Sequence, residues 1–456
     1  MNIGMNNRRT LRAALGMCAL AGLLVTAGAQ TTALVSRASG AIGTLGNGDS
    51  PLVGAKISGN GQFVVFRSAA SNLVAGDTNG YADVFVRDTT THATTRVSVD
   101  SLGLQAVGGD SNNPCISADG RFVAFSSTAT NLVAGGTSGS HVFLHDRQTG
   151  ITTLVSVGSD GITPGNAASD SSSIWSNGAS SVKVAFRSSA GNLITGGTTG
   201  SQVFVRDMDF NITSLASAVD GGSAQGNGDS GWVQTAISGD GSTVGFTSGA
   251  SNLVASDTNG NVNDVFTRNL NTNTTTLISQ TTTGLQGLGS SNSCALSTDG
   301  SIVAFQSYNG MVNGDTNGFG DVFVRDTNTN TTTRVSIASG ANGVQGNGAS
   351  GNSNGWGIAI SGDGSRVLFQ SLAKNLTSKD TNNFEDIFLR NRTTNSTVMV
   401  SVTPANKLAN GSSGGLNTCG VSMSANGQFM MFASYASNLV SGDSNGKMDV
   451  FRRGPY

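Results

Sequence analysis

Short apolar segments recur at a regular interval along the chain, each just after an Asn-Gly or Asp-Gly pair. Each segment runs to a Phe, and consecutive Phe residues of this set are 59 to 64 residues apart. A fixed period with β-type sequence in every unit predicts one repeated module rather than several different domains. The seven pairs are Asn60-Gly61, Asp119-Gly120, Asn177-Gly178, Asp240-Gly241, Asp299-Gly300, Asp363-Gly364 and Asn426-Gly427. The Phe residues that follow them are Phe66, Phe125, Phe186, Phe246, Phe305, Phe369 and Phe432.

The second repeat shows the parts of one module. Asp119-Gly120 predicts a two-residue hairpin turn with positive φ at both central residues. Three β-type segments follow, and one more precedes the next turn; they are residues 121–126, 142–146, 152–157 and 172–176. Each unit therefore has four strands, which we call a to d. Strand a lies just ahead of the Asn/Asp-Gly turn, and strands b, c and d follow it.

Strands c and d are rich in β-branched and apolar residues at consecutive positions, which predicts sheets buried on both faces. A single four-stranded sheet cannot bury its own faces, whereas seven sheets packed radially cover one another. The last repeat stops after strand c, residues 449–453, while residues 31–36 match strand d of the other repeats. The sequence therefore predicts an all-β, seven-bladed β-propeller whose last blade is completed by the N-terminal strand.

Residues 1–29 have the order of a secretory signal peptide. Arg8, Arg9 and Arg12 precede an apolar run over residues 13–25, and Ala27-Gly28-Ala29 offers a small-residue cleavage site. The run is too short for a stable membrane span. We expect a periplasmic or secreted protein in which residues 30–456 form a single propeller domain with no membrane span.

Composition narrows the choice of partners. Without residues 1–29, which hold three Arg and no acid, 22 basic and 27 acidic residues remain, and Glu385 is the only acid that is not Asp. Asp favours turns and caps, which agrees with the β prediction. The chain has no basic patch, so we expect no nucleic-acid partner.

Three cysteines fall outside the signal segment, Cys115, Cys294 and Cys419, each in a different repeat. An odd number leaves at least one free thiol unless two chains pair. We expect these residues to be small buried side chains on the inner strands. No Cys-x-x-Cys is present to support zinc or redox chemistry.

The loops between strands b and c carry a recurring Asp-x-Asn-Gly pattern followed by the Asp that opens strand c. Oxygen ligands at positions one and three, a Gly bend and a later carboxylate resemble part of a calcium loop, although the full EF-hand pattern is not matched. The alternative is a turn in which Asp and Asn bond their own backbone. Ca²⁺ is the one cofactor that the sequence suggests. Its candidate ligands are Asp77, Asn79, Asp83, Asp257, Asn259, Asp264, Asp315, Asn317, Asp321, Asp380, Asn382, Asp386, Asp443, Asn445 and Asp449.

The loops from strand d to the next strand a hold further acids and two tryptophans. Up-and-down strand order puts these loops on the same end of the ring as the b–c loops. Acids there could form an acidic channel mouth or simply be solvated. The candidate acids are Asp49, Asp110, Asp170 and Asp229. Exposed Trp232 and Trp356 could stack on a sugar or hold a protein, with packing between blades as the alternative.

The sequence offers no catalytic constellation, and we assign no catalytic residue. His92 falls in a c–d turn. His141 and His145 stand where other repeats carry Asp and Arg, so we interpret this pair as structural replacements, with a metal-binding pair as the alternative. No nucleophile elbow or zinc-protease motif is present. An Arg recurs at the end of strand c, and we expect it to pair with a neighbouring acid. Its copies are Arg87, Arg206, Arg268, Arg325 and Arg390.

The repeat resembles the TolB-like, WD-like β-propeller repeats of exported bacterial proteins. Its signature is Ser-x-Asp-Gly-(Arg/Gln)-Phe-Val-Ala-Phe, then Asn-Leu-Val-x-Gly-Asp-Thr-Asn-Gly, Asp-Val-Phe-Val-Arg-Asp and Thr-Thr-x-Val-Ser, over residues 31–453. The resemblance implies a binding module of the periplasm or the exterior, on a fold that serves many functions.

Three functions agree with these observations. The leading hypothesis is an exported, non-enzymatic scaffold that binds a protein or a glycan at its loop-rich face, with calcium in some b–c loops. The alternative is a carbohydrate lyase or hydrolase that uses acids at the channel mouth. A purely structural envelope component is the third.

Overall fold

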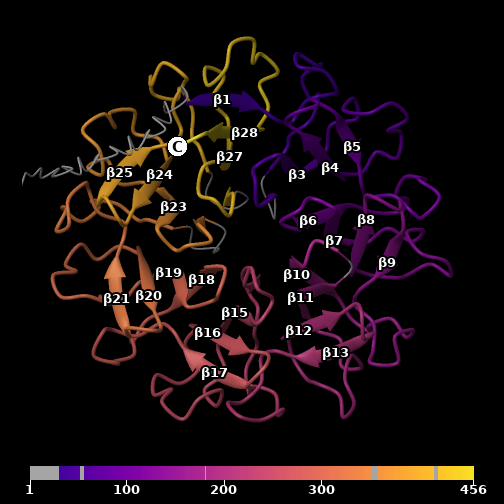
Figure 1. The fold of residues 1–456 in the computed structure, drawn as a ribbon, viewed down its shortest axis with the longest axis horizontal. Helices are drawn as coiled ribbons and strands as arrows, with labels where there is room; N and C mark the ends of the chain where they lie inside the picture. The colour runs from indigo at the N-terminus through magenta and orange to yellow at the C-terminus, as the bar shows by residue number, and fades with distance from the viewer. Residues whose placement is uncertain (1–29, 52–55, 180, 352–356, 415–419) are drawn as a thin grey trace, which may run out of the picture.

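The computed structural model describes residues 30–456 except 52–55, 180, 352–356 and 415–419. The described residues form seven four-stranded antiparallel sheets, which stand around a central opening as the blades of a propeller (Figure 1). They form no helix, and hence none with the length and hydropathy needed to cross a bilayer. The predicted seven-bladed fold is confirmed.

The strands of each blade follow one another from the central opening outward, in the order a to d. Blade one contains β2 (Lys56–Ile57), β3 (Phe63–Ser68), β4 (Asp83–Asp88) and β5 (Thr94–Arg96); blade two contains β6 (Ser111–Ile116), β7 (Phe122–Ser127), β8 (His141–Asp146) and β9 (Thr152–Leu154). Blade three contains β10 (Ser169–Ser176), β11 (Val182–Ser188), β12 (Gln202–Asp207) and β13 (Ile212–Leu215); blade four contains β14 (Ala236–Ile237), β15 (Thr243–Ser248), β16 (Asp264–Asn269) and β17 (Thr274–Leu277). Blade five contains β18 (Ser291–Leu296), β19 (Ile302–Ser307), β20 (Asp321–Asp326) and β21 (Thr331–Arg334); blade six contains β22 (Ile358–Ile360), β23 (Arg366–Ser371), β24 (Asp386–Asn391) and β25 (Ser396–Met399). Blade seven contains β26 (Val421–Met423), β27 (Met430–Ser434), β28 (Asp449–Gly454) and β1 (Thr31–Leu34).

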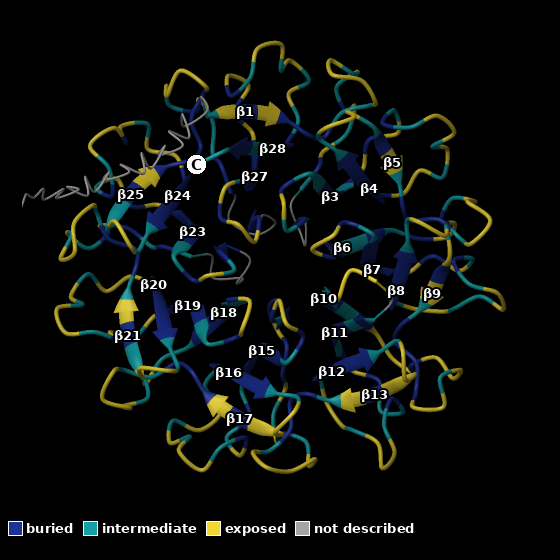
Figure 2. Cartoon of the chain, in the orientation of Figure 1, coloured by how far each residue is buried: buried dark blue, intermediate teal, exposed yellow. Residues whose placement is uncertain are grey.

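Burial differs between the middle and outer strands of each blade (Figure 2). In β4 and β16 every residue but the last is buried, as the apolar runs predict. The outer strand β17 instead alternates exposed and buried residues. The prediction of burial on both faces was therefore wrong for strand d, because radial sheets diverge toward the rim and leave one face of the outer strand open.

A Phe pair lies at the centre of every blade. Phe66 on β3 lies opposite Phe85 on β4, with ring centroids 5.8 Å apart and both side chains fully buried. The other six blades repeat this pair at centroid distances of 5.8 to 6.0 Å. The Phe of strand b that marks the sequence period is thus half of a repeated aromatic contact that packs each blade.

The a–b turns differ in detail from the predicted hairpin. Gly120 has φ of 78°, and its N–H donates to Ser117 O at 2.9 Å, while Ser117 N donates to Phe122 O. Asp119 is not among the described residues with positive φ; its carboxylate accepts from Arg121 N instead. The prediction of positive φ at both central residues was wrong for the Asp, because the turn places four residues between its paired positions and needs a left-handed residue only at the Gly.

The two ends of the chain close the ring, as predicted. β1 pairs antiparallel with β28, with Thr31 opposite Gly454 and Leu34 opposite Phe451. Ser36 then donates to Asp449 at the start of β28. Closure through the N-terminal strand removes the open edge that blade seven would otherwise present.

Candidate functional site

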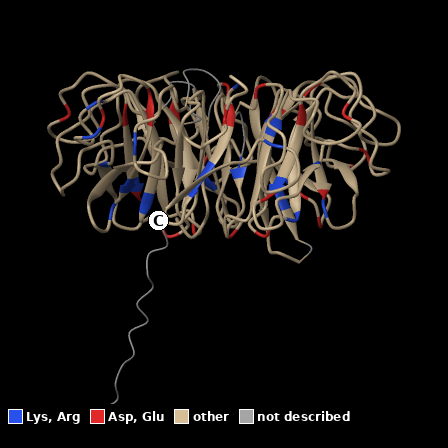
Figure 3. Cartoon of the chain, turned by 90° about the horizontal axis from the view of Figure 1, so that it is seen from above, with Lys and Arg blue, Asp and Glu red and all other residues tan. Residues whose placement is uncertain are grey.

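The b–c loops and the d–a loops lie at the same end of the ring, as predicted. They are also hydrogen-bonded to one another. In blade one, Asn79 Nδ2 donates to Ala106 O in the d–a loop at 3.0 Å and to Asp83 Oδ2 at 2.9 Å. Figure 3 shows acidic positions of the strands near one edge of the ring and basic positions nearer the opposite edge. We call the end with the b–c and d–a loops the loop-rich face.

The Asn of the Asp-x-Asn-Gly pattern forms the turn that was the alternative to a calcium loop. Its Oδ1 accepts the backbone N–H two residues later, from Tyr81 to Asn79 at 2.9 Å in blade one. Asn317, Asn382 and Asn445 make the same bond. The Asn oxygen is therefore already engaged by its own loop in these four blades.

In blades one and five an arginine lies between the two carboxylates of the pattern. Arg96 Nη1 lies 3.2 Å from Asp77 Oδ1 and 3.3 Å from Asp83 Oδ2. In blade five, Arg334 Nη1 lies 3.1 Å from Asp315 Oδ1 and 3.4 Å from Asp321 Oδ2. These arginines come from the end of strand d, opposite the buried Phe of strand c. Here a guanidinium stands where the calcium prediction puts the ion.

In blade four a glutamine takes the place of the arginine. Gln286 Nε2 donates to Asp257 Oδ1 at 3.0 Å and to Asp264 Oδ2 at 2.8 Å. Leu277 is the strand d residue at the position of Arg96. The amide satisfies the same two oxygens without a charge.

Blades six and seven place an apolar residue at both donor positions. Opposite the strand c Phe stand Met399 and Leu34, and the residue at the position of Gln286 is Leu408 in blade six and Leu45 in blade seven. Burial raises the pKa of Asp386 to about 6, and the neighbouring carboxylate of Asp380 adds to the rise. In blade seven, burial and then Asp449 raise the pKa of Asp443 to about 6. In both blades the two donor positions are apolar, so neither position supplies a nitrogen to the carboxylate pair.

Blades two and three lack the acids, and other polar residues fill the start of strand c. His141 Nδ1 lies 3.0 Å from Ser156 Oγ, and Gln202 accepts from Ser217 at 2.7 Å. These are the contacts that Asp83 makes with Ser98 in blade one. His145 contacts Thr152 Oγ1 at 2.9 Å. The interpretation of both histidines as structural replacements is confirmed, and burial lowers the pKa of each.

The recurring Arg of strand c forms no ion pair with any acid in the described part of the chain, so that prediction was wrong. Arg268 is 2% exposed, and its guanidinium donates to Val219 O and Gly222 O in the d–a loop that arrives from blade three. Arg390 makes the same bonds to Ala338 O and Gly340 O. Because a buried loop leaves carbonyl groups without water, this Arg serves as a donor that joins adjacent blades. The sequence does offer a signal for this role, because the Arg recurs within a strand whose other residues are mostly apolar.

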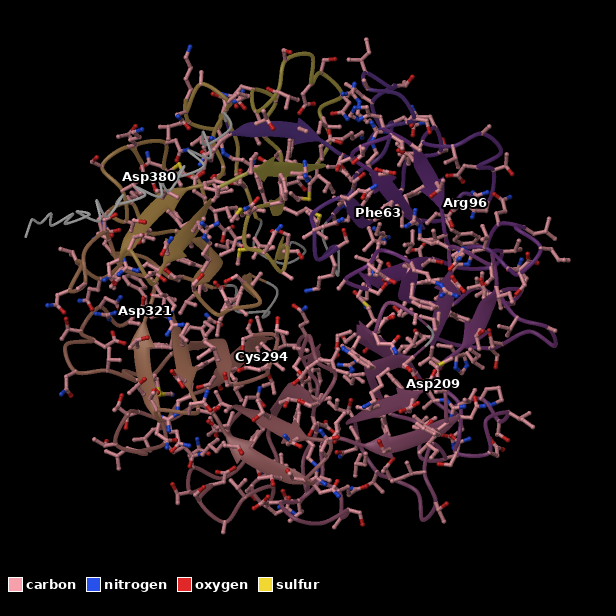
Figure 4. The ribbon with its side chains drawn as sticks, viewed as in Figure 1. Phe63, Arg96, Asp209, Cys294, Asp321 and Asp380 are labelled. Carbon is pink, nitrogen blue, oxygen red and sulfur yellow. The ribbon has the colours of Figure 1, made fainter. Side chains whose placement is uncertain are left out.

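The acids of the d–a loops are held by neighbouring loops. Asp110 Oδ1 accepts from Ala82 N at 2.8 Å, and Asp229 Oδ1 accepts from Ser201 N at 2.8 Å. Figure 4 places Asp321 and Asp380 well away from the central opening, with Cys294 nearer to it. The described residues that line the axial channel include no acid.

The axial channel is lined by the inner strands of all seven blades and has a volume of about 210 Å³. Lys56, Cys115 and Cys294 contribute to its wall. Both thiols are free and buried, as predicted, and burial raises their pKa values. Cys419 lies outside the described residues.

A hollow of about 280 Å³ opens beside Trp232 on the loop-rich face, between blades three and four. Trp232 is 60% exposed, and the Arg187 guanidinium lies over its ring at 5.7 Å from the centroid. Arg187 also donates to Asp170 at 3.0 Å. Asp229 and Ser201 complete the polar wall. Trp356 lies outside the described residues.

No protein-family model and no curated protein sequence matches the chain. Among solved structures, the chain is similar to a prolyl endopeptidase with 10% identity and a TM-score of 0.50, over 90% of this chain and 51% of that one. An oligogalacturonate lyase from Vibrio parahaemolyticus has 13% identity and a TM-score of 0.47, over 89% of this chain and 91% of that one. A protein described as TolB from Agrobacterium tumefaciens has 11% identity and a TM-score of 0.34, over 77% and 79%. At 10% identity, the likeness to the prolyl endopeptidase concerns the fold alone.

Proposed function

We propose that this protein is an exported, non-enzymatic binding propeller that holds a glycan in the Trp232 hollow, with divalent cations at some Asp-x-Asn-Gly loops. The observation that carries the glycan proposal is the exposed Trp232 ring beside Arg187, over a hollow of about 280 Å³. An indole face is an apolar platform of the kind on which a sugar ring stacks.

The polar groups around the ring supply the other half of a glycan site. Arg187 is held by Asp170, and Ser201 and Asp229 line the same hollow. A few placed polar groups around an aromatic surface give orientation and specificity in ligand sites. The export part of the proposal rests on residues 1–29 of the sequence.

The test is titration of the purified chain with a panel of soluble polysaccharides, followed by calorimetry and tryptophan fluorescence. We expect saturable binding that Trp232→Ala weakens at least tenfold. Trp175→Phe is the matched control, because Trp175 lies on β10 with its ring N–H bonded to Gly239 O, away from the hollow.

Three other outcomes would change the proposed site or the proposed function. Binding that survives Trp232→Ala would overturn the proposed site. Release of unsaturated or shortened sugars from the same panel would instead support the carbohydrate lyase or hydrolase alternative. A saturable protein partner from envelope extract, without glycan binding, would move the function to a protein ligand.

A further inference from the structure

Two buried carboxylate oxygens in blade six lack a hydrogen-bond partner, although the same two oxygens have a donor in three other blades. Asp380 is 7% exposed and Asp386 is fully buried, and neither Asp380 Oδ1 nor Asp386 Oδ2 has a partner. A buried polar atom without a partner is costly, and more so when it is charged. The site therefore needs either a proton or a cation.

The other blades show what occupies this position. Arg96 Nη1 contacts Asp77 Oδ1 and Asp83 Oδ2 in blade one, and Arg334 makes the same pair of contacts in blade five. Gln286 Nε2 donates to the corresponding Oδ1 and Oδ2 in blade four. One position in the fold is thus filled three times by a nitrogen donor from the chain itself.

In blade six both residues at the positions that supply this nitrogen are apolar. Met399 stands at the position of Arg96, and Leu408 stands at the position of Gln286. Asn382 Nδ2 donates to Ala409 O at 3.3 Å, and Asp386 Oδ2 has no donor within hydrogen-bond distance. Blade six therefore has both carboxylates but no side-chain donor at either position.

We propose that blade six binds one divalent cation of the hard, oxygen-preferring class between Asp380 Oδ1 and Asp386 Oδ2, where blades one and five carry an arginine nitrogen. The proposal rests on the cation-binding part of the proposed function and assigns it to one blade. Carboxylate oxygens suit Ca²⁺ and Mg²⁺, with waters completing the shell. Met399 and Leu408, at the two donor positions, line a cavity of about 1120 Å³.

Blade seven is the nearest comparison and differs in two ways. Asn445 Nδ2 donates to Asp449 Oδ2 at 2.8 Å, so that oxygen is already engaged. Asp443 is only partly buried, whereas Asp380 is 7% exposed. We therefore assign the cation to blade six alone.

The experiment measures metal binding to the full chain without any glycan, at pH 7.5 after treatment with a chelator. Calorimetry and thermal melting are run with CaCl₂ and, in parallel, with MgCl₂. We expect one site per chain, and a ligand at about 100 times its dissociation constant should stabilise the fold by roughly 2.7 kcal/mol. Asp380→Asn and Met399→Arg should each abolish both the binding heat and the melting shift.

Asp77→Asn is the matched control, because it removes the equivalent carboxylate from a blade that has Arg96. This variant should keep the full response to metal. Met399→Arg adds a readout that does not depend on metal, since it should melt above the metal-free wild type if the guanidinium takes the proposed position.

The outcomes separate this proposal from the broader one. Metal binding that persists in Asp380→Asn and Met399→Arg would overturn the assignment to blade six and leave cation binding by another loop. Absence of any binding heat and any melting shift with either metal would overturn both. Glycan binding at Trp232 is measured separately and is unaffected by either result.

Discussion

Arg453 Nη1 donates a hydrogen bond of 2.6 Å to Thr32 Oγ1, although the two residues are 421 positions apart in the sequence. The same nitrogen donates to Val402 O at 2.9 Å. Arg453 is 1% exposed. One buried guanidinium therefore joins the first strand, the last strand and the loop that leaves blade six.

Replacing this arginine should weaken closure of the ring. We expect Arg453→Met to lower the free energy of unfolding by roughly 2–4 kcal/mol, because buried carbonyl and hydroxyl oxygens lose a charged donor. Urea unfolding followed by circular dichroism measures the change. Arg67→Met is the control: Arg67 pairs at 3.3 Å with Asp110, whose side chain is 43% exposed, and such pairs contribute about 0–1 kcal/mol. Equal losses in the two variants would contradict a special role for Arg453.

Two glycines separate the effect of a positive φ from the effect of close packing. Gly120 has φ of +78°, and a Cβ there would lie 2.2 Å from the ring of Phe63, on β3 of the preceding blade. Gly80 has φ of +73° with open space around it. We expect Gly80→Ala to cost about 1 kcal/mol from backbone strain alone. Gly120→Ala should cost clearly more, with a lower melting temperature, and equal melting temperatures would contradict the packing argument.

Much of the fold follows from the sequence because the repeat shows it seven times. The Phe66–Phe85 contact is a case in point: both residues recur at a fixed place, and antiparallel register sets them opposite each other. The match of residues 31–36 to strand d likewise predicts the pairing of β1 with β28. A single short apolar segment does not identify a strand, but seven copies with the same pattern do.

The site is less predictable because its differences lie outside the motif. The Asp and Asn positions of the pattern are the same in blades one and six, and only Asn383 in place of Gly80 distinguishes the two loops there. The difference that reaches the carboxylates is Arg96 against Met399, on a strand that follows the loop by more than ten residues. Only the register of strand d against strand c brings that residue to the carboxylates. A comparison of aligned repeats at the end of strand d was the one signal available.

Lys56, in the channel wall, should make the free energy of unfolding of the protein depend on pH. Burial lowers its pKa from 10.5 to about 8, and the Cys115 and Cys294 groups oppose the shift. Between pH 8 and 10.5 the unfolded chain therefore holds a proton that the folded chain has lost, so this group favours unfolding below pH 8 and loses that effect as the pH rises through the window.

The comparison variant is Lys56→Met. We expect it to be more stable than the wild type by roughly 2–3 kcal/mol at pH 7, with the difference falling toward zero near pH 10.5. Urea midpoints of both proteins across this range measure the change, and other titrating groups cancel in the difference. A difference that stays constant with pH would show that the amine is well solvated.

Blade two offers a test in which a substitution should stabilise the protein. His145 stands at the position of Arg87 and Arg268, and its Nδ1 contacts Thr152 Oγ1. The arginines at this position also reach carbonyl groups of the preceding loop. We expect His145→Arg to raise the free energy of unfolding by about 1–2 kcal/mol, since each hydrogen bond to a charged group contributes about 1.5–3 kcal/mol before the side-chain entropy is lost.

The neighbouring His141 supplies the contrast. His141→Asp restores the residue of the other blades and its contact with Ser156, but it buries a carboxylate in a blade whose strand d ends in Leu154 rather than in an arginine. We expect this variant to be less stable than the wild type at pH 7 and to recover as the pH falls and the acid becomes protonated. If both substitutions stabilise the protein equally, matching the repeat consensus would be sufficient, and the argument that each buried charge needs its own partner would fail.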